Sequence, residues 1–144
     1  MTIRPRAARN VRDLRTRLRD IAAASHANTV AARERSREAL DAERRTLDEH
    51  LDTAETELLE ARSVFDIETF EEDTGVHRIA IADATKQLDQ DTTQTQISET
   101  ALRERARQLR SAEKLVERIE LGVSRREATA EQRANDDISA RPRR

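Results

Sequence analysis

Residues 64–78 read V-F-D-I-E-T-F-E-E-D-T-G-V-H-R, and this stretch near the middle of the 144-residue chain decides the fold. It places Gly75 beside a cluster of acidic residues, and the other helix breakers are Pro5, Gly122 and Pro142. The flanking segments are rich in Ala, Leu, Arg, Glu, Gln and Asp, most of which favour helix. A glycine in an acidic, polar cluster near the midpoint predicts a turn rather than one uninterrupted helix.

We therefore predict an all-α fold, a long two-helix antiparallel coiled-coil hairpin that occupies residues 1–144 as a single unit. The first helix is expected at about residues 6–65, an acidic turn at about 66–76 and the second helix at about 77–138. The first helix would span about 90 Å, since each residue rises about 1.5 Å. With a turn near residue 72, residue i faces a residue numbered about 144 − i. The alternative is a parallel dimer in which each chain forms one continuous helix.

The composition restricts the class of protein. Charged residues make up 39% of the chain and aromatic residues 1%, namely Phe65 and Phe70. This leaves too little apolar volume for a globular core with a pocket, but enough for the thin line of contacts in a coiled coil. The mean hydropathy of −0.89 also fits a disordered chain. The apolar residues recur periodically, however, and periodicity favours packed helices.

Other features of the sequence predict where the protein resides. The chain has no cysteine, which excludes disulfides and cysteine-based metal sites and is typical of a reducing cytosol. The start of the chain has no continuous apolar stretch, so we expect neither a secretory signal nor a membrane span. Its arginines resemble a mitochondrial transit peptide, but Asp13 and Asp20 argue against that interpretation. We expect a cytoplasmic protein without direct membrane insertion.

Heptad spacing predicts the seam, which is the line of side chains packed between the two helices. In the second half one nearly apolar line consists of Ile81, Leu88, Thr95, Leu102, Leu109, Val116, Val123 and Ala130. Its weaker companion line consists of Ala84, Asp91, Ser98, Arg105, Ala112, Ile119 and Arg126. The first half begins with Val11, Leu14, Leu18 and Ile21, and resumes in a shifted register at Leu47, Leu51, Ala54, Leu58, Ala61 and Phe65. This shift predicts a stutter near residues 30–45.

The net charge of −2 conceals a separation of charge along the sequence. Residues 1–20 hold seven arginines against two aspartates, and residues 101–126 hold eight basic side chains against four acidic ones. Residues 46–75 hold eleven acidic side chains against one arginine. In a hairpin, this order produces a basic free end and an acidic turn. Most single charges are ordinary solvated helix surface, but their segregation would orient the protein in the field of a charged partner.

No residue pattern predicts catalysis, a cofactor or a metal site. His26, His50 and His77 lack a second ligand at the spacing of a known metal motif. The chain has only two glycines and therefore no glycine-rich phosphate loop. Two helices also form no cleft that would desolvate a carboxylate. Nucleic-acid binding is an alternative for the basic end, but acidic residues interleave there and no aromatic side chain is available to stack on bases, so we expect none.

Both phenylalanines lie in or beside the predicted turn, where Phe65, Ile67 and Phe70 stand among acidic residues. A structural interpretation is that Phe65 ends the seam and Phe70 covers it. A functional interpretation is an apolar contact patch framed by negative charge, because large aromatic side chains are favoured anchors of interfaces. The functional interpretation makes these three residues candidate contacts for a partner.

A family resemblance is carried by residues 113–141, which read E-K-L-V-E-R-I-E-L-G-V-S-R-R-E-A-T-A-E-Q-R-A-N-D-D-I-S-A-R. This run resembles the C-terminal helix of the FliJ family and of its injectisome counterparts of the SctO (YscO) type. Those proteins have E-K-x-x-E-R, then E-Q-x-x-x-D-(D/E) and a closing arginine. The matching residues are Glu113, Lys114, Glu117, Arg118, Arg126, Glu127, Glu131, Gln132, Asp136, Asp137 and Arg141. The arginine-rich, leucine-spaced start also resembles that family, whereas the acidic turn and the seam without aromatic residues depart from it.

This resemblance implies a function that the residue patterns do not show by themselves. It implies a non-catalytic cytosolic hairpin, similar to the central stalk of rotary ATPases, at the periphery of a membrane-bound export complex. The implied partners are a hexameric export ATPase, whose pore the free helix ends enter, and the cytoplasmic domain of the export gate. Some members of the family also bind export chaperones.

The resemblance and the charge pattern together suggest which residues meet these partners. Arginine forks onto carboxylates, so it suits acidic loops in an ATPase ring. The residues expected at the ring are Arg12, Arg15, Arg19, Arg103, Arg107 and Arg110. The residues expected to meet the export gate or another partner are Phe65, Ile67 and Phe70. The alternative function is a generic structural coiled-coil spacer or dimerising scaffold.

Overall fold

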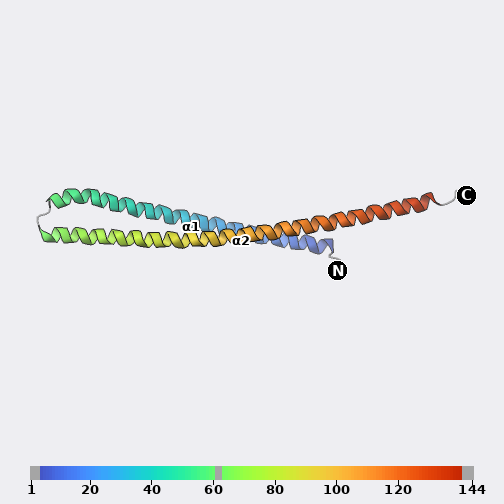
Figure 1. Ribbon diagram of the computed structural model, residues 1–144, viewed down its shortest axis with the longest axis horizontal. Helices are drawn as coiled ribbons and strands as arrows, with labels where there is room; N and C mark the ends of the chain where they lie inside the picture. Colours follow the sequence, from blue (N-terminus) through green and yellow to red (C-terminus); the bar gives the residue numbers. More distant parts are fainter. Residues whose placement is uncertain (1–3, 61–62, 141–144) are drawn as a thin grey trace. The chain divides into compact units, whose positions relative to one another are not determined.

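The computed structural model describes residues 4–60 and 63–140, apart from the side chains at positions 57 and 58. Helix α1 runs over Pro5–Glu60 and helix α2 over Val64–Ser139. The described residues contain no strand. The two helices form an antiparallel helical hairpin, as Figure 1 shows, and this confirms the predicted fold class.

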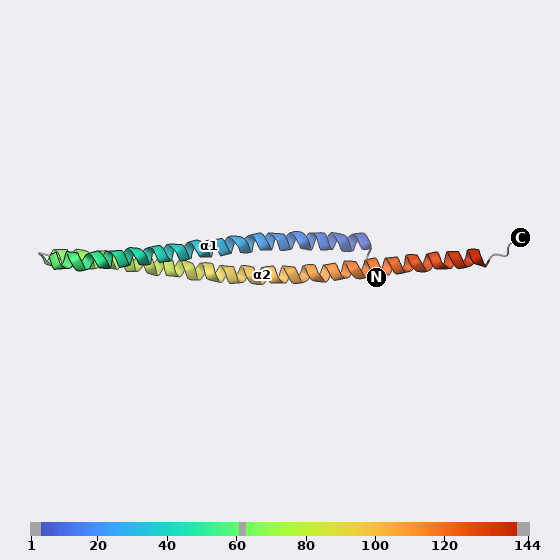
Figure 2. The same cartoon turned by 90° about the horizontal axis from the view of Figure 1, so that it is seen from above.

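Two compact units divide this hairpin. The free-end unit comprises residues 1–23 and 101–144, and the turn unit comprises residues 24–100. Each unit contains a stretch of α1 beside a stretch of α2 (Figures 1 and 2). The core of the free-end unit is small and apolar, with Ala8, Leu109, Ala112 and Val116 buried. The core of the turn unit is more polar, since Thr74 and Thr95 are buried together with Leu40 and Ala54.

The start of α2 is fixed by a capping box. The Ser63 amide donates to Asp66 Oδ2 at 3.2 Å, and the Asp66 amide donates to Ser63 Oγ at 3.4 Å. Such a reciprocal pair satisfies two amides that a helix start leaves without partners. The chain therefore reverses between Glu60 and Val64, and the predicted turn at residues 66–76 is wrong.

Gly75, the residue on which the predicted turn rested, lies inside α2. Its φ is not positive, so the backbone there needs no glycine. A helical glycine costs only about 1 kcal/mol relative to alanine. Packing offsets that cost, because Thr74 is buried and its neighbours Phe70 and His77 are half-buried in the seam.

The earlier turn changes which residues face each other. Thr29 faces Ser98, and His50 faces Thr74. The predicted turn would have placed residues 115 and 94 opposite them. The offset also makes α2 the longer helix, with 76 residues against 56.

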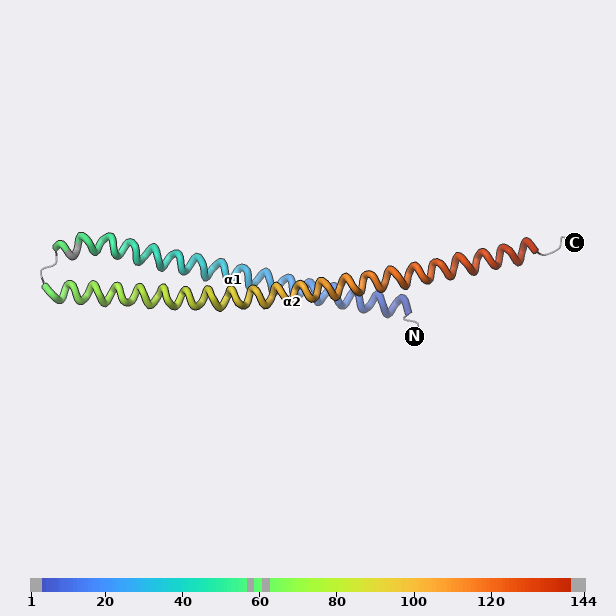
Figure 3. The backbone as a smooth tube through the Cα atoms, viewed as in Figure 1, coloured from blue at the N-terminus to red at the C-terminus, as the bar shows by residue number. Residues whose placement is uncertain are grey.

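The extra length of α2 lies at its C-terminal end. Residues 124–139, which we name the α2 overhang, are exposed at every position. Figure 3 shows this end of α2 continuing beyond the first turn of α1 within the free-end unit. Arg126 and Ala130, both predicted in the seam, lie on the overhang and are exposed. Their heptad spacing is correct, but no part of α1 lies opposite them.

The remainder of the predicted α2 seam is largely confirmed. The buried or half-buried positions on the strong line are Ile81, Leu88, Thr95, Leu102, Leu109, Val116 and Val123. Those on the weak line are Ala84, Asp91, Ser98, Ala112 and Ile119. Arg105 is exposed, and the half-buried residue near it is Ala106.

The predicted α1 seam is wrong by one residue over its first half. The seam-facing positions are Ala8, Arg12, Arg15, Arg19, Ala22, His26, Thr29, Arg33, Ser36, Leu40, Glu43, Leu47, His50 and Ala54. They alternate in steps of four and three without interruption, so α1 has no stutter. The predicted apolar stripe lies one residue away and faces outward, with Val11 42%, Leu14 56% and Ile21 66% exposed and Leu18 half-buried. Of the predicted later positions, Leu51 and Phe65 are exposed, while the Leu58 side chain and Ala61 lie outside the described residues.

Candidate interaction surfaces

A polar network crosses the seam of the turn unit. The Thr29 and Ser98 hydroxyl oxygens lie 2.7 Å apart, His26 Nδ1 lies 2.9 Å from Ser98 Oγ, and the Thr95 hydroxyl donates to the Thr29 carbonyl at 3.1 Å. Within the described part of the chain, no buried side-chain nitrogen or oxygen lacks a hydrogen-bond partner. A satisfied polar network in a coiled coil specifies register at some cost in stability. This network explains why a seam so poor in leucine keeps a single pairing.

Asp91 extends the network toward the turn. Ser36 Oγ on α1 donates to Asp91 Oδ2, and Gln87 Nε2 donates to both carboxylate oxygens at 3.2 and 3.3 Å. The Ser36 hydrogen bond, the Gln87 hydrogen bonds and the positive charge of Arg35 together hold the pKa of Asp91 below its usual value, against a smaller opposing effect of desolvation. Asp91 therefore remains a carboxylate in the seam.

A ring cluster occupies the seam nearest the turn. The His50 ring stacks on Phe70 with centroids 4.8 Å apart, and its centroid lies 4.9 Å from that of His77. Thr74 Oγ1 lies 3.1 Å from His50 Nε2 and donates its own proton to the Phe70 carbonyl. Phe70 is consequently a seam residue, and of its two interpretations the structural one fits its position.

The described residues contain no group of three or more His, Cys, Asp or Glu arranged to hold a metal ion. Within that part of the chain, His50 and His77 therefore form no such group with a third side chain. Their positions in the seam fit packing.

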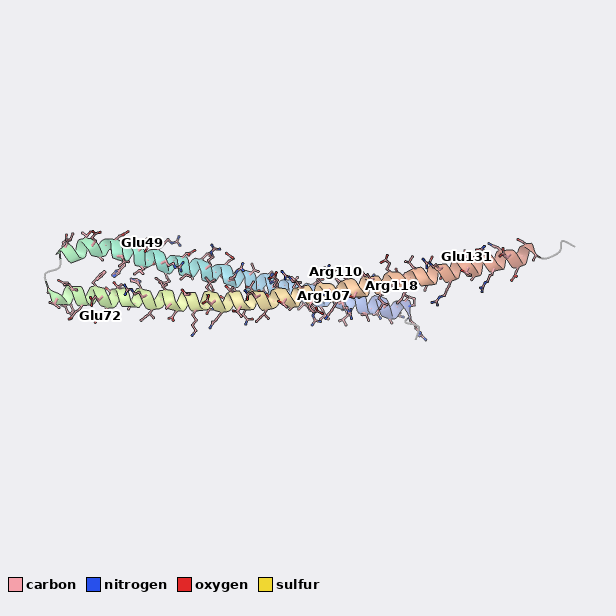
Figure 4. The ribbon with its side chains drawn as sticks, viewed as in Figure 1. Glu49, Glu72, Arg107, Arg110, Arg118 and Glu131 are labelled. Carbon is pink, nitrogen blue, oxygen red and sulfur yellow. The ribbon has the colours of Figure 1, made fainter. Side chains whose placement is uncertain are left out.

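The other two predicted contact residues of the turn are exposed. Phe65 is 72% exposed and Ile67 is 44% exposed. Phe65 therefore does not end the seam. Two further apolar side chains are exposed here, since Leu59 at the end of α1 is 85% exposed and Val64 at the start of α2 is 70% exposed. Glu49 and Glu72 are exposed and lie on the outer sides of α1 and α2 (Figure 4).

The six predicted arginines all lie in the free-end unit, but in three different settings. Arg12 and Arg19 occupy seam positions and pair with neighbouring aspartates, Arg12 with Asp13 at 2.8 Å and Arg19 with Asp20 at 2.6 Å. Arg15 is also in the seam and donates from Nη1 to the Gln108 carbonyl of α2 at 2.8 Å. The stems of these arginines fill space that apolar side chains would otherwise occupy.

The α2 arginines of this set are all exposed. Arg107 lies 3.5 Å from Glu104, and Arg103, Arg107 and Arg110 project from the surface of the helix. Figure 4 labels Arg107 and Arg110 on α2, together with Arg118 about two turns beyond Arg110 on the same helix. These side chains are exposed basic groups of the free-end unit.

Two open grooves flank the seam of the free-end unit, and their charges are opposite. One groove is lined by Arg12, Glu113, Val116, Glu117, Glu120, Leu121 and Ser124. The other, which we name the basic groove, is lined by Val11, Arg15, Ser111, Ala112, Lys114, Leu115 and Arg118. The acidic side is partly neutralised, since Glu120 accepts from Arg9 at 2.9 Å. Sequence counts missed this division because they sum charge along a segment without regard to the side of the helix.

Neither helix, over the residues the structure describes, carries a stretch long and apolar enough to cross a membrane. A family model described as the flagellar FliJ protein matches residues 9–142. This match covers nearly the whole chain, including both helices and both units. No curated protein and no solved structure matches the chain.

Proposed function

The chain belongs to the FliJ family, a structural component of the flagellar export apparatus, and we propose that it acts there as a stalk whose basic free end enters a hexameric export ATPase. The observation that carries this proposal is the family match over residues 9–142, because it includes nearly all of the free-end unit. A generic coiled-coil spacer would need no such match.

The electrostatics of the free-end unit support a docking role. Arg103, Arg107 and Arg110 are exposed on one helix, within a segment of net positive charge. Arginine binds carboxylates with two parallel hydrogen bonds, so acidic loops lining a pore are suitable partners. Exposed charges of this kind accelerate association more than they increase affinity. In this proposal Arg15 chiefly joins the two helices through the Gln108 carbonyl, Arg12 and Arg19 pair with Asp13 and Asp20 of α1, and the α2 arginines meet the ring.

The turn of the hairpin is proposed to meet the cytoplasmic domain of the export gate. Phe65 and Ile67 are exposed and are flanked by acidic residues. Phe70 supports them from within the seam, where it stacks on His50. Neither surface holds a cofactor in this proposal, and the protein acts without catalysis of its own in the cytoplasm.

The test of ring docking is a charge reversal on exposed positions only. The variant Arg103→Glu/Arg107→Glu/Arg110→Glu should weaken binding to the purified export ATPase and reduce its stimulation, while circular dichroism shows unchanged helix content. The matched control is Arg35→Glu/Arg37→Glu/Arg44→Glu, which changes the net charge equally at exposed positions of the turn unit. The loss should shrink at high salt because exposed charges are screened. Full binding by the α2 variant would exclude docking through these charges, and a wild-type chain that binds no export ATPase would exclude the proposed partner.

A further inference from the structure

The basic groove is an apolar hollow with an entirely cationic rim. Val11, Ala112 and Leu115 provide its apolar surface, and Arg15, Lys114 and Arg118 provide the charges. Val11 is 42% exposed and Leu115 is 38% exposed, so both retain apolar area that the hairpin does not cover. A groove between two helices with this composition fits an apolar element that carries negative charge.

Apolar surface continues from this groove along α1. Leu14 is 56% exposed and Ile21 is 66% exposed, because the heptad frame of α1 places Arg15 and Arg19 in the seam instead. Val11, Leu14 and Leu18 are spaced by three and four residues, so they lie on one face of the helix. A contiguous apolar stripe outside a packed seam marks an interaction surface.

Charge selects the occupant of this surface. A second free-end unit presenting its own α1 would bring arginine against arginine, since residues 1–20 carry seven arginines and two aspartates. Like charges placed together at an interface weaken it strongly. The occupant must therefore be acidic, and it must expose apolar side chains of its own.

The turn of this same chain meets both requirements. Residues 46–75 hold eleven acidic side chains and one arginine. Its apolar side chains Leu59, Val64 and Phe65 are each at least 70% exposed. The chain thus carries two complementary surfaces, an apolar groove with a cationic rim and an apolar turn with an anionic rim.

We propose that the acidic turn of one copy docks into the basic groove of a second copy. The contact joins two different surfaces. Two copies form a closed dimer when each docks its turn into the groove of the other, and otherwise successive copies assemble into a chain. It covers the free-end unit of one copy and the turn of the other, and so withholds both from other partners. The proposal does not rest on the function in export, because it concerns the chain alone.

Sedimentation velocity of the full chain at increasing concentration tests the association directly. At low salt the mass should rise from one copy to two or more. At about 1 M salt, where the Debye length is about 3 Å, the association should weaken by about tenfold or more. A chain that remains a monomer at low salt and at every concentration would overturn the proposal. The occupant of the groove would then be a different acidic protein.

Charge exchange identifies the two surfaces. The groove variant Lys114→Glu/Arg118→Glu and the turn variant Glu68→Lys/Glu72→Lys change exposed residues only. Each alone should weaken association by about tenfold or more, since each sets like charges against each other. An equimolar mixture should associate again, because the unchanged turn of the groove variant fits the unchanged groove of the turn variant, and the reversed groove accepts the reversed turn.

The control variant is Arg125→Glu/Arg126→Glu, which changes the charge equally on the exposed α2 overhang. It should associate like the wild type. A mixture that fails to regain association, while each variant retains wild-type helix content, would show that other surfaces mediate it. Association that survives both reversals would lead to the same conclusion.

Discussion

At the scale of single residues, Leu109 is one of the few buried apolar side chains that stabilise the free-end unit. It is 6% exposed and lies between the buried Ala112 and the half-buried Leu102 on the same face of α2. We expect Leu109→Asp to reduce the free energy of unfolding by at least the roughly 2–5 kcal/mol that truncation of a packed leucine costs, since it also buries a charge. Thermal unfolding followed by circular dichroism measures the loss.

The matched control for this substitution is Ile138→Asp on the α2 overhang, where Ile138 is 67% exposed. It should unfold like the wild type. Equal destabilisation by both substitutions would mean that burial of Leu109 in the seam does not contribute to the stability of the fold.

The ionisation of Asp91 depends on its hydrogen bonds in the seam, so its pKa measures whether those bonds are formed. Because its pKa is lowered in the folded chain, it stabilises the fold above the pKa it has when unfolded, near 3.8. That contribution is lost as the pH falls through the lower folded pKa. Ser36→Ala removes the largest cause of the shift, so the pKa of Asp91 should rise toward its ordinary value. A carboxyl-carbon NMR titration measures it, and Ser111→Ala, whose hydroxyl bonds only within α2, should leave the Asp91 curve unchanged.

At the scale of elements, Gly75 distinguishes a turn from a helix. A Cβ at this position meets no atom within 4 Å, and φ is not positive. Gly75→Ala should therefore stabilise the chain by about 0.5–1 kcal/mol, because alanine loses less backbone entropy in a helix. Urea unfolding gives the difference, and Gly122→Ala, which is equally unobstructed, should produce a gain of the same size. If Gly75→Ala destabilised the chain and Gly122→Ala did not, the turn would lie at Gly75, as the sequence first indicated.

The elements also show what could be predicted from the sequence. Residue propensity and periodicity predicted two helices, and the heptad line through Ile81, Leu88 and Leu109 predicted the packed face of α2. The turn was misplaced because Gly75 and the acidic cluster resemble a helix stop. The real signal was the capping box formed by Ser63 and Asp66, which contains no glycine or proline.

The face of α1 could not be predicted from hydrophobicity alone. Val11, Leu14 and Ile21 form the most apolar stripe near its start, yet the heptad frame that packs Leu40, Leu47 and Ala54 places arginines toward α2 there. The steps of four and three continue without a stutter from Ala8 to Ala54, so the residues packed further along α1 also determine which side chains face α2 near its start. The candidate surfaces were likewise predicted only in part. The positive charge of the free end could be read from the sequence. Its division between two grooves could not, because that division depends on which face each helix turns toward the other.

At the scale of the whole molecule, the position of the turn determines every contact between the helices. Thr29 Oγ1 and Ser98 Oγ lie 2.7 Å apart, and the chain has no native cysteine. Thr29→Cys/Ser98→Cys should form an intramolecular disulfide on mild oxidation, visible as a shifted band in non-reducing electrophoresis. Thr29→Cys/Leu115→Cys, the pair that a turn near residue 72 would bring together, should not. Cross-linking of the second pair instead would contradict the observed pairing.

Because of the α2 overhang, the free-end unit is one helix wide over residues 124–139 and two helices wide where α1 lies beside α2. A single helix is about 10–12 Å across with its side chains, and packed neighbours lie about 8–10 Å apart, so the two-helix portion is about 20 Å across. The sixteen residues from Ser124 to Ser139 extend for about 24 Å at about 1.5 Å per residue. An opening wider than one helix but narrower than two admits this length and stops at the first turn of α1. The start of α1 at Pro5 thus acts as a shoulder, and shortening or lengthening α1 would set how deeply the chain reaches into any such opening.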